Sequence, residues 1–187
     1  LVWPPQDHII SPPHMKIIQE GLGYLPPIGL LYLATWLRDR TPHDAEVLDA
    51  YLERMSPEDV ARRVQQTRPD VLGLSTMTYT WLDCLLVARA VKKVAPDLPI
   101  VVGGPHTALY PQESLEHPEI DYVAVGDGEI PLQGLLDRLA DRRLWGAAAH
   151  VRFVVSHPEH RAELVRTPAC RGWVRTGRVW AAAMREA

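Results

Sequence analysis

The sequence predicts an α/β domain, a three-layer sandwich in which helices cover both faces of a five-stranded parallel sheet. Two observations support this prediction. Apolar runs and helical patterns alternate five times along the first 143 of the 187 residues. The apolar runs are continuous and do not alternate with polar residues, which is typical of parallel strands that are buried on both faces.

Each strand is predicted from a short apolar run that ends in turn residues. The first strand, residues 2–4, runs into a pair of prolines. The other four are expected at residues 45–51, 70–77, 99–104 and 121–126. We expect the sheet order 2-1-3-4-5, which is that of the flavodoxin-like class of doubly wound, Rossmann-like folds.

Each helix is predicted from apolar spacing or from start and stop signals. Residues 26–40 open with two prolines and place apolar side chains at helical spacing: Leu30, Leu33, Ala34 and Leu37. A second helix should start at Ser56, a hydroxyl cap followed by proline and two acids, and should end near Arg68. Further helices are expected before Pro96, over residues 111–119 and over residues 130–142.

Composition and charge exclude several classes of partner. The chain is 47% hydrophobic and 23% charged, as globular proteins are, and its net charge of −3 gives no reason to expect nucleic acid. No apolar run approaches the roughly 20 residues that a membrane-spanning helix needs. Without a signal peptide, the expectation is a cytoplasmic protein. Cys84 and Cys170 are too few and too far apart for a disulfide framework or a zinc site.

Charge divides the chain into two parts near Leu144. Residues 1–143 hold 13 Lys and Arg against 20 Asp and Glu, a net charge of −7. Residues 144–187 hold seven Arg against three Glu, a net charge of +4. This Arg-, Ala- and Trp-rich tail is interpreted as a linker, an appendage or an out-of-frame translation. The chain also begins inside an apolar run, as a fragment would.

The ligand site of such a fold is expected in the segments that follow the strands. These segments contain glycines, hydroxyls and a few acids, and they lack the glycine-rich patterns that bind dinucleotides or triphosphates. Gly103 and Gly104 end the fourth strand side by side, which indicates that something approaches the backbone there. This end of the sheet therefore suits a bulky, flat and largely neutral group.

Four segments, PPIGLLYLATWL, VLGLSTMT, IVVGGPHT and YVAVGDGE, resemble the cobalamin-binding domain of radical S-adenosylmethionine enzymes, a group that includes corrinoid-dependent methyltransferases. The resemblance covers residues 1–143. It implies that cobalamin is the cofactor and that its benzimidazole tail lies against the fourth strand. The cofactor-binding residues it implies are Ser75, Thr78, Thr80, Gly103, Gly104, Gly126 and Gly128. It assigns no catalytic residue and no metal ligand in this chain.

Two departures from related proteins refine this expectation. Classical cobalamin modules carry Asp-x-His-x-x-Gly after the first strand, whereas here Asp7 and His8 are adjacent and Ser11 follows. The resemblance therefore implies cobalamin bound base-off, without a histidine ligand. The Cys-x-x-x-Cys-x-x-Cys motif is also absent. S-adenosylmethionine and the four-iron cluster would then belong to a partner radical S-adenosylmethionine barrel domain of the intact methyltransferase-type enzyme. The alternative is a non-catalytic interaction or regulatory domain with an empty groove.

Single polar residues near the strand ends have simpler interpretations. His106 is expected to be a loop residue with a satisfied hydrogen bond, and a metal-ligand role for it or for His8 is less favoured. Cys84 is expected in the core and Asp49 in a turn. Asp127 and Glu129 are expected in a solvated turn or as hydrogen-bond acceptors for corrin amides.

Overall fold

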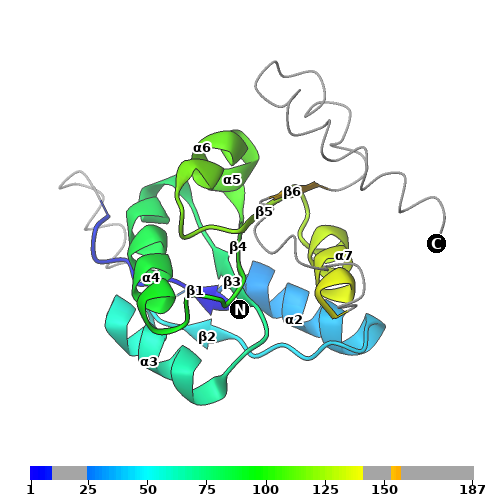
Figure 1. Cartoon of the computed structure of the whole chain (residues 1–187), viewed down its shortest axis with the longest axis horizontal. Helices are drawn as coiled ribbons and strands as arrows, with labels where there is room; N and C mark the ends of the chain where they lie inside the picture. The colour runs from blue at the N-terminus through cyan, green and yellow to red at the C-terminus, as the bar shows by residue number, and fades with distance from the viewer. Residues whose placement is uncertain (10–24, 141–152, 157–187) are drawn as a thin grey trace.

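A parallel sheet forms the centre of the domain. The computed structural model describes residues 1–9, 25–140 and, for the backbone, 153–156. Its strands are β1 (Val2–Trp3), β2 (Leu48–Asp49), β3 (Leu72–Ser75), β4 (Ile100–Gly103), β5 (Tyr122–Val125) and β6 (Phe153–Ser156). They are ordered β2-β1-β3-β4-β5-β6, and every neighbouring pair is parallel (Figure 1). The order predicted for the first five strands is confirmed.

The sixth strand comes from the segment that composition set apart. Residues 153–156 pair with all four residues of β5, from Tyr122 to Val125. The boundary expected near Leu144 lies outside the described residues and stays a prediction.

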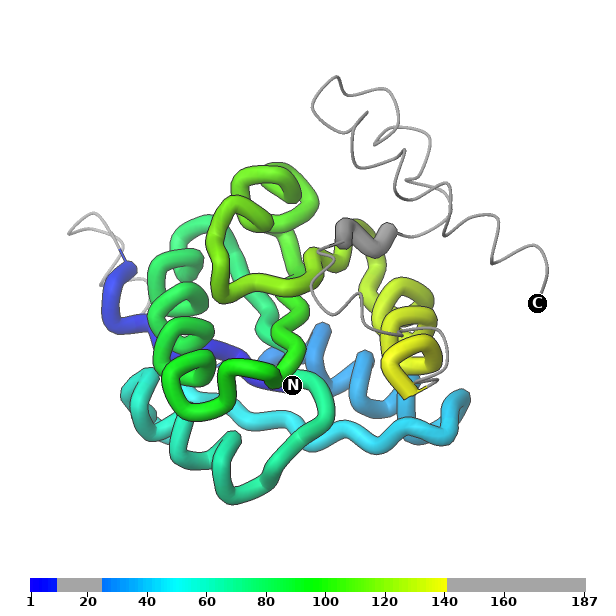
Figure 2. Tube along the Cα trace, in the orientation of Figure 1, coloured from blue at the N-terminus to red at the C-terminus, as the bar shows by residue number. Residues whose placement is uncertain are grey.

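Helices cover both faces of the sheet. On one side lie α3 (Pro57–Thr67) and α4 (Trp81–Val94), and on the other lie α2 (Ile28–Arg40) and α7 (Glu129–Ala140) (Figure 1). Figure 2 shows the chain passing from β4 through two short helices, α5 (Pro105–Leu109) and α6 (Pro111–Glu116), before it returns to β5. The three-layer sandwich is thus confirmed. Within the described residues, every helix is too short or too polar to cross a membrane.

The start of α3 shows how local sequence sets an element. The Ser56 hydroxyl accepts a hydrogen bond from the Asp59 amide, and the Asp59 carboxylate accepts one from the Ser56 amide. The hydrogen bonds from Ser56 and Arg62 lower the pKa of Asp59 to about 2. This reciprocal capping box confirms the predicted helix start.

The two faces of the sheet carry different side chains. Toward α3 and α4, an aliphatic face is buried in the main core and consists of Val2, Leu48, Leu72, Leu74, Ile100, Val102, Val123 and Val125. Because side chains alternate along a strand, the residues between these point toward α2 and α7. Four of these residues, on β3, β4 and β5, are small: Gly73, Ser75, Gly103 and Ala124. We call these four residues the small-residue floor.

Candidate functional site

A groove of about 330 Å³ lies over the small-residue floor at the carboxyl end of the sheet. All four floor residues line it. Its walls include Leu30 and Leu33 from α2 and Leu132 from α7. Residues 126–129, the turn between β5 and α7, form its edge. This is the end of the sheet at which doubly wound folds bind their ligands.

At Gly103, neither the backbone conformation nor the packing of the fold requires a glycine. A Cβ atom placed on Gly103 would lie 3.6 Å from the Cβ of Ala124, which is an ordinary van der Waals contact. The backbone of Gly103 is extended within β4, a conformation that any residue adopts. The absent side chain therefore leaves room above the strand that the protein does not fill.

The other three predicted glycines have backbone or packing reasons to be glycine. Gly104 has a φ of 109°, and a Cβ there would lie 2.5 Å from the carbonyl oxygen of Thr76. Gly126 also has a positive φ, of 87°. A Cβ on Gly128 would come within 3.1 Å of the Leu33 side chain. All three line the groove, so they shape its wall through the path of the backbone.

The predicted hydroxyl residues separate into two groups. Ser75 ends β3 opposite Gly103 of β4 and lines the groove. Thr80 is completely buried, and its hydroxyl accepts a hydrogen bond from the Met77 amide and donates one to the Met77 carbonyl. Thr78 is exposed in the same 3₁₀ turn. Neither threonine is among the residues that line the groove.

Two floor residues were missed by sequence reasoning. Gly73 lies two positions before Ser75 on β3, and Ala124 belongs to β5, beside Gly103. The alternation of side chains along β3 could have identified Gly73, because residues two apart share one face of a sheet. Ala124 could be found only with the register between β4 and β5.

The charge of the groove favours a ligand without a large negative charge. Asp127 and Glu129 lie at its edge. Among the described residues that line it, none is Lys, Arg or His. The carboxylates are able to accept hydrogen bonds from amide groups of a ligand, and they would repel a polyphosphate.

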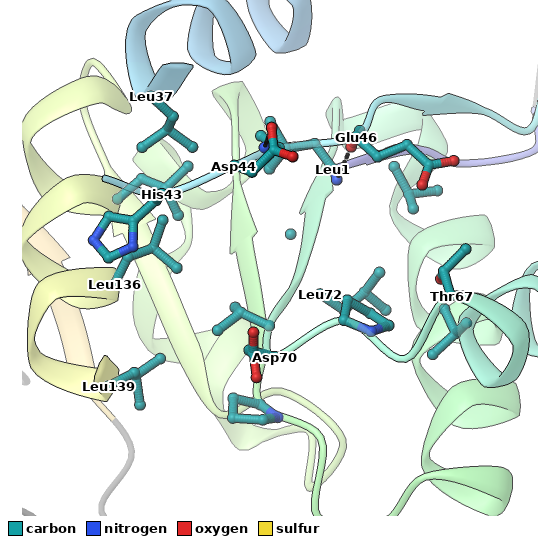
Figure 3. A pocket seen from close by; sticks show the side chains of 18 of the residues that line it. Leu1, Leu37, His43, Asp44, Glu46, Thr67, Asp70, Leu72, Leu136 and Leu139 are labelled. Carbon is teal, nitrogen blue, oxygen red and sulfur yellow. Dashed lines mark hydrogen bonds between the residues drawn. The ribbon is translucent and has the colours of Figure 1, made fainter. Parts of the chain in front are cut away.

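A larger pocket, of about 730 Å³, opens at the amino end of the sheet (Figure 3). Figure 3 shows Leu37, Leu136 and Leu139 along its α2 and α7 side, with Asp44 and Asp70 on segments that precede strands. The Leu1 amino group donates a hydrogen bond of 2.6 Å to the Glu46 carbonyl there, and burial lowers its pKa. Since this is the opposite end from the strand-end loops, we assign the ligand site to the smaller groove.

Comparison with known proteins decides the family. Residues 16–136 match the B12 binding domain family. The chain belongs to this family. The match confirms the resemblance inferred from the four segments of sequence.

Relatives of this B12-binding domain are longer proteins. It is 32% identical over 137 residues to the uncharacterized methyltransferase PH0819 of Pyrococcus horikoshii, an alignment that covers 72% of this chain and 29% of the relative. It is 28% identical over 151 residues to the anaerobic magnesium-protoporphyrin IX monomethyl ester cyclase of Rubrivivax gelatinosus, covering 80% of this chain and 27% of the cyclase. It is 33% identical over 133 residues to the cobalamin-dependent radical SAM methyltransferase TokK of Streptomyces tokunonensis, an alignment that covers 67% of this chain and 19% of TokK. The B12-binding domain thus spans less than a third of each of these proteins.

The groove fits the group that the family name implies. Cobalamin combines a flat aromatic base with a macrocycle that carries neutral amide arms. The small-residue floor offers the base a stretch of sheet that carries no large side chains, and the groove edge offers carboxylates for the amides. The space above Gly103, which a side chain would fill, is the structural observation that agrees with this ligand.

The two histidines near the strand ends lie outside the residues that line the groove. His8 Nδ1 is 2.5 Å from Oδ1 of Asp83 in α4, and the His8 amide donates to the other carboxylate oxygen. This hydrogen bond raises the pKa of His8. The prediction for His106 was wrong, because it lies in α5 instead of a loop and its buried ring nitrogens have no hydrogen-bond partner.

Other single-residue predictions agree with the structure. Cys84 is completely buried in the main core. Asp49 accepts a hydrogen bond of 2.8 Å from the Leu52 amide, as a turn residue does. Asp127 is exposed and Glu129 is partly exposed at the start of α7.

Proposed function

We propose that this domain binds cobalamin base-off, without a histidine ligand, as the cofactor module of a radical S-adenosylmethionine methyltransferase-type enzyme. The observation that carries the proposal is the small-residue floor, above all Gly103, whose missing side chain serves no purpose in the fold. When bound, cobalamin supplies a cobalt centre that can carry a methyl group. The residues of this chain bind and orient it.

Each lining residue has a role that follows from its chemistry. Gly103 and Ala124 allow the benzimidazole to lie on the sheet surface. The Ser75 hydroxyl, at the carboxyl end of β3, can hydrogen-bond the nucleotide tail. Asp127 and Glu129 accept hydrogen bonds from amide arms of the corrin.

The placement of His8 supports binding without a histidine ligand. Its Nδ1 and its amide both contact Asp83, whose side chain is only 1% exposed. To reach the groove, His8 would have to leave this buried carboxylate without that partner, which is costly. In this position, His8 would supply no imidazole ligand to a bound cobalt.

A partner domain is proposed to supply the reaction chemistry. The domain spans 19% of TokK, whose name identifies it as a cobalamin-dependent radical SAM methyltransferase. Large apolar side chains are exposed at the carboxyl end of the sheet, after β3, β4 and β5: Tyr79, Leu82, Leu109, Tyr110 and Ile130. Such a surface suits coverage by a further domain that holds the four-iron cluster and S-adenosylmethionine.

Titration of the purified chain with hydroxocobalamin tests the proposal. We expect saturable binding, a visible spectrum typical of the base-off form, and a melting temperature that rises with ligand concentration. His8→Ala should bind with the same spectrum. An absence of binding would favour the alternative, an interaction or regulatory domain with an empty groove. A spectral change caused by His8→Ala would overturn the ligand assignment.

A further inference from the structure

His106 is a buried imidazole without a hydrogen-bond partner. Its side chain is 3% exposed, and both Nδ1 and Nε2 are buried and unpaired. A neutral imidazole always has one N–H donor and one acceptor nitrogen, so both functions are unused here. Buried polar atoms are nearly always paired, and such an exception requires a physical reason.

Ring contacts take the place of hydrogen bonds. The imidazole stacks on the indole of Trp81, the first residue of α4, with centroids 4.3 Å apart and planes inclined by 26°. Tyr110 lies on another side, at 5.3 Å between centroids. His106 therefore connects α5 to α4 through aromatic packing alone.

The helix that carries His106 also forms part of the groove wall. Helix α5 has only five residues, so its stability depends on tertiary contacts. The His106 amide donates a hydrogen bond of 3.4 Å to the Thr76 carbonyl after β3, and the Thr107 hydroxyl donates one of 3.0 Å to the Ala124 carbonyl of β5. Pro105, in its first turn, and Gly104, immediately before it, line the groove.

Burial, more than the surrounding charges, favours the neutral form of His106. Burial lowers the pKa of His106, the Glu113 carboxylate of α6 acts in the opposite direction, and His117 after α6 lowers it further. Tyr110, which precedes α6, and the Trp81 indole of α4 contribute the ring contacts. The Asp83 carboxylate in the first turn of α4 is bound by His8. A protonated ring would hold two buried N–H donors without acceptors.

We propose that His106 is a positioning residue whose neutral imidazole holds α5 and the adjoining groove wall in the binding conformation, so that protonation of His106 releases cobalamin. The inference rests on the proposed function, because it assigns acid release to that same groove. It makes His106 a pH-sensitive element outside the groove. The direction of the pH effect follows from the lowered pKa of His106. The neutral ring contributes its full stabilisation of the folded state above about pH 6.5, and this contribution is lost as the pH falls through the lower pKa of the folded state.

The first experiment measures the hydroxocobalamin dissociation constant between about pH 5.5 and 8, the range in which histidine side chains titrate. For the wild type, we expect a constant value at high pH and an increase of up to about tenfold per pH unit below the pKa of His106. His106→Phe keeps a ring that can stack but cannot titrate, so its dissociation constant should not vary with pH. His8→Gln is the matched control and should keep the wild-type profile.

A second experiment needs no ligand. NMR titration gives the pKa of the His106 ring, and amide exchange at Thr107 and Ala108 reports the order of α5. We expect protection of these amides to fall with the same midpoint as the ring titration, and to stay constant in His106→Phe. Thermal melts at about pH 8 check that this variant is folded.

The outcomes separate the two proposals. If no variant binds cobalamin at any pH, the proposed function fails, while the NMR titration still tests the role of His106. If wild type and His106→Phe bind with the same pH profile, acid release through His106 is wrong. Protonation of the ring without a change in the α5 amides would also overturn the inference.

Discussion

The two faces of the sheet have opposite side chains, and strand β3 shows the contrast within four residues. Leu72 and Leu74 are buried in the main core against α3 and α4, whereas Gly73 and Ser75 line the groove on the other face. Strand β4 shows the same contrast between its two faces, with Val102 in the core and Gly103 at the groove. One face of the sheet therefore provides stability, and the carboxyl half of the other face provides space.

This division explains why small residues are tolerated in the middle of the sheet. Toward the amino end, the groove face is apolar and buried, with Val101 and Tyr122 packed among Leu132 and Leu135. The small residues of this face are Gly73 and Ser75 of β3, Gly103 at the end of β4, and Ala124 of β5. The predicted consequence is that stability and ligand binding respond to different substitutions in the same strands.

The largest effect is expected for Gly103→Val. A Cβ at this position makes only an ordinary contact with Ala124, and valine suits a strand, so the fold should be retained. The two methyl groups would occupy the space proposed for the ligand. The resulting steric clash cannot be relieved cheaply, because protein interiors are closely packed. We expect absorbance titration of Gly103→Val with cobalamin to show no binding. The wild type, but not this variant, should gain about 2.7 kcal/mol of stability against unfolding when the ligand concentration is 100 times its dissociation constant.

Gly103→Ala is the graded control for this substitution. Its single added carbon should weaken binding less than valine does and should leave the melting temperature unchanged. If Gly103→Val binds cobalamin as tightly as the wild type, the ligand does not lie on the small-residue floor.

Leu72→Ala tests the opposite face of a neighbouring strand. Leu72 is 3% exposed in the main core and is not among the residues that line the groove. A leucine-to-alanine change in a core costs about 2–5 kcal/mol. Urea unfolding should show this loss, while the affinity of the folded fraction for cobalamin stays within about twofold, because small changes on the far face alter no ligand contact. A large loss of affinity without a loss of stability would show that the two faces are not independent.

Gly104→Ala separates two adjacent glycines. Gly104 has a φ of 109°, and an added Cβ would meet the Thr76 carbonyl oxygen at 2.5 Å. Residues forced into such conformations cost about 1–3 kcal/mol, so this variant should unfold at lower denaturant concentration, whereas Gly103→Ala should not. Equal stability of the two alanine variants would mean that the left-handed turn after β4 does not require glycine.

Sequence alone predicted the elements whose signals are local. The continuous apolar runs gave β3, β4 and β5, and the Ser-Pro-Glu-Asp segment gave the start of α3. Helix α5 was expected to be a loop, because five residues carry no periodicity and tertiary hydrogen bonds, such as that from Thr107 to Ala124, stabilise it. Strand β6 lies in a segment of unusual composition, where no strand was expected.

The same distinction applies to the groove. Glycines at strand ends could be identified from sequence, since few other residues fit a close approach or a positive φ. Thr80 was expected to contact the ligand, but its hydroxyl binds the backbone of its own turn at Met77. Sequence shows that a hydroxyl is present and not which way it points. The stacking of His106 on Trp81 depends on two helices meeting and has no sequence signal.

The smallest effect is expected for Ser75→Ala, at the one floor residue with a polar side chain. Ser75 lies opposite Gly103 in the register of β3 and β4, so its hydroxyl borders the space proposed for the nucleotide tail. A neutral hydrogen bond contributes about 0.5–1.5 kcal/mol net, which corresponds to a loss of roughly 2- to 13-fold in affinity. Cobinamide, which lacks the nucleotide tail, is the matched ligand: its affinity should not change in Ser75→Ala, whereas that of cobalamin should fall. Equal losses for both ligands in absorbance titrations would place the Ser75 hydroxyl against the corrin ring, and no loss for either would remove Ser75 from the site. Because alanine keeps the floor small, this variant measures the hydrogen bond separately from the space that Gly103→Val removes.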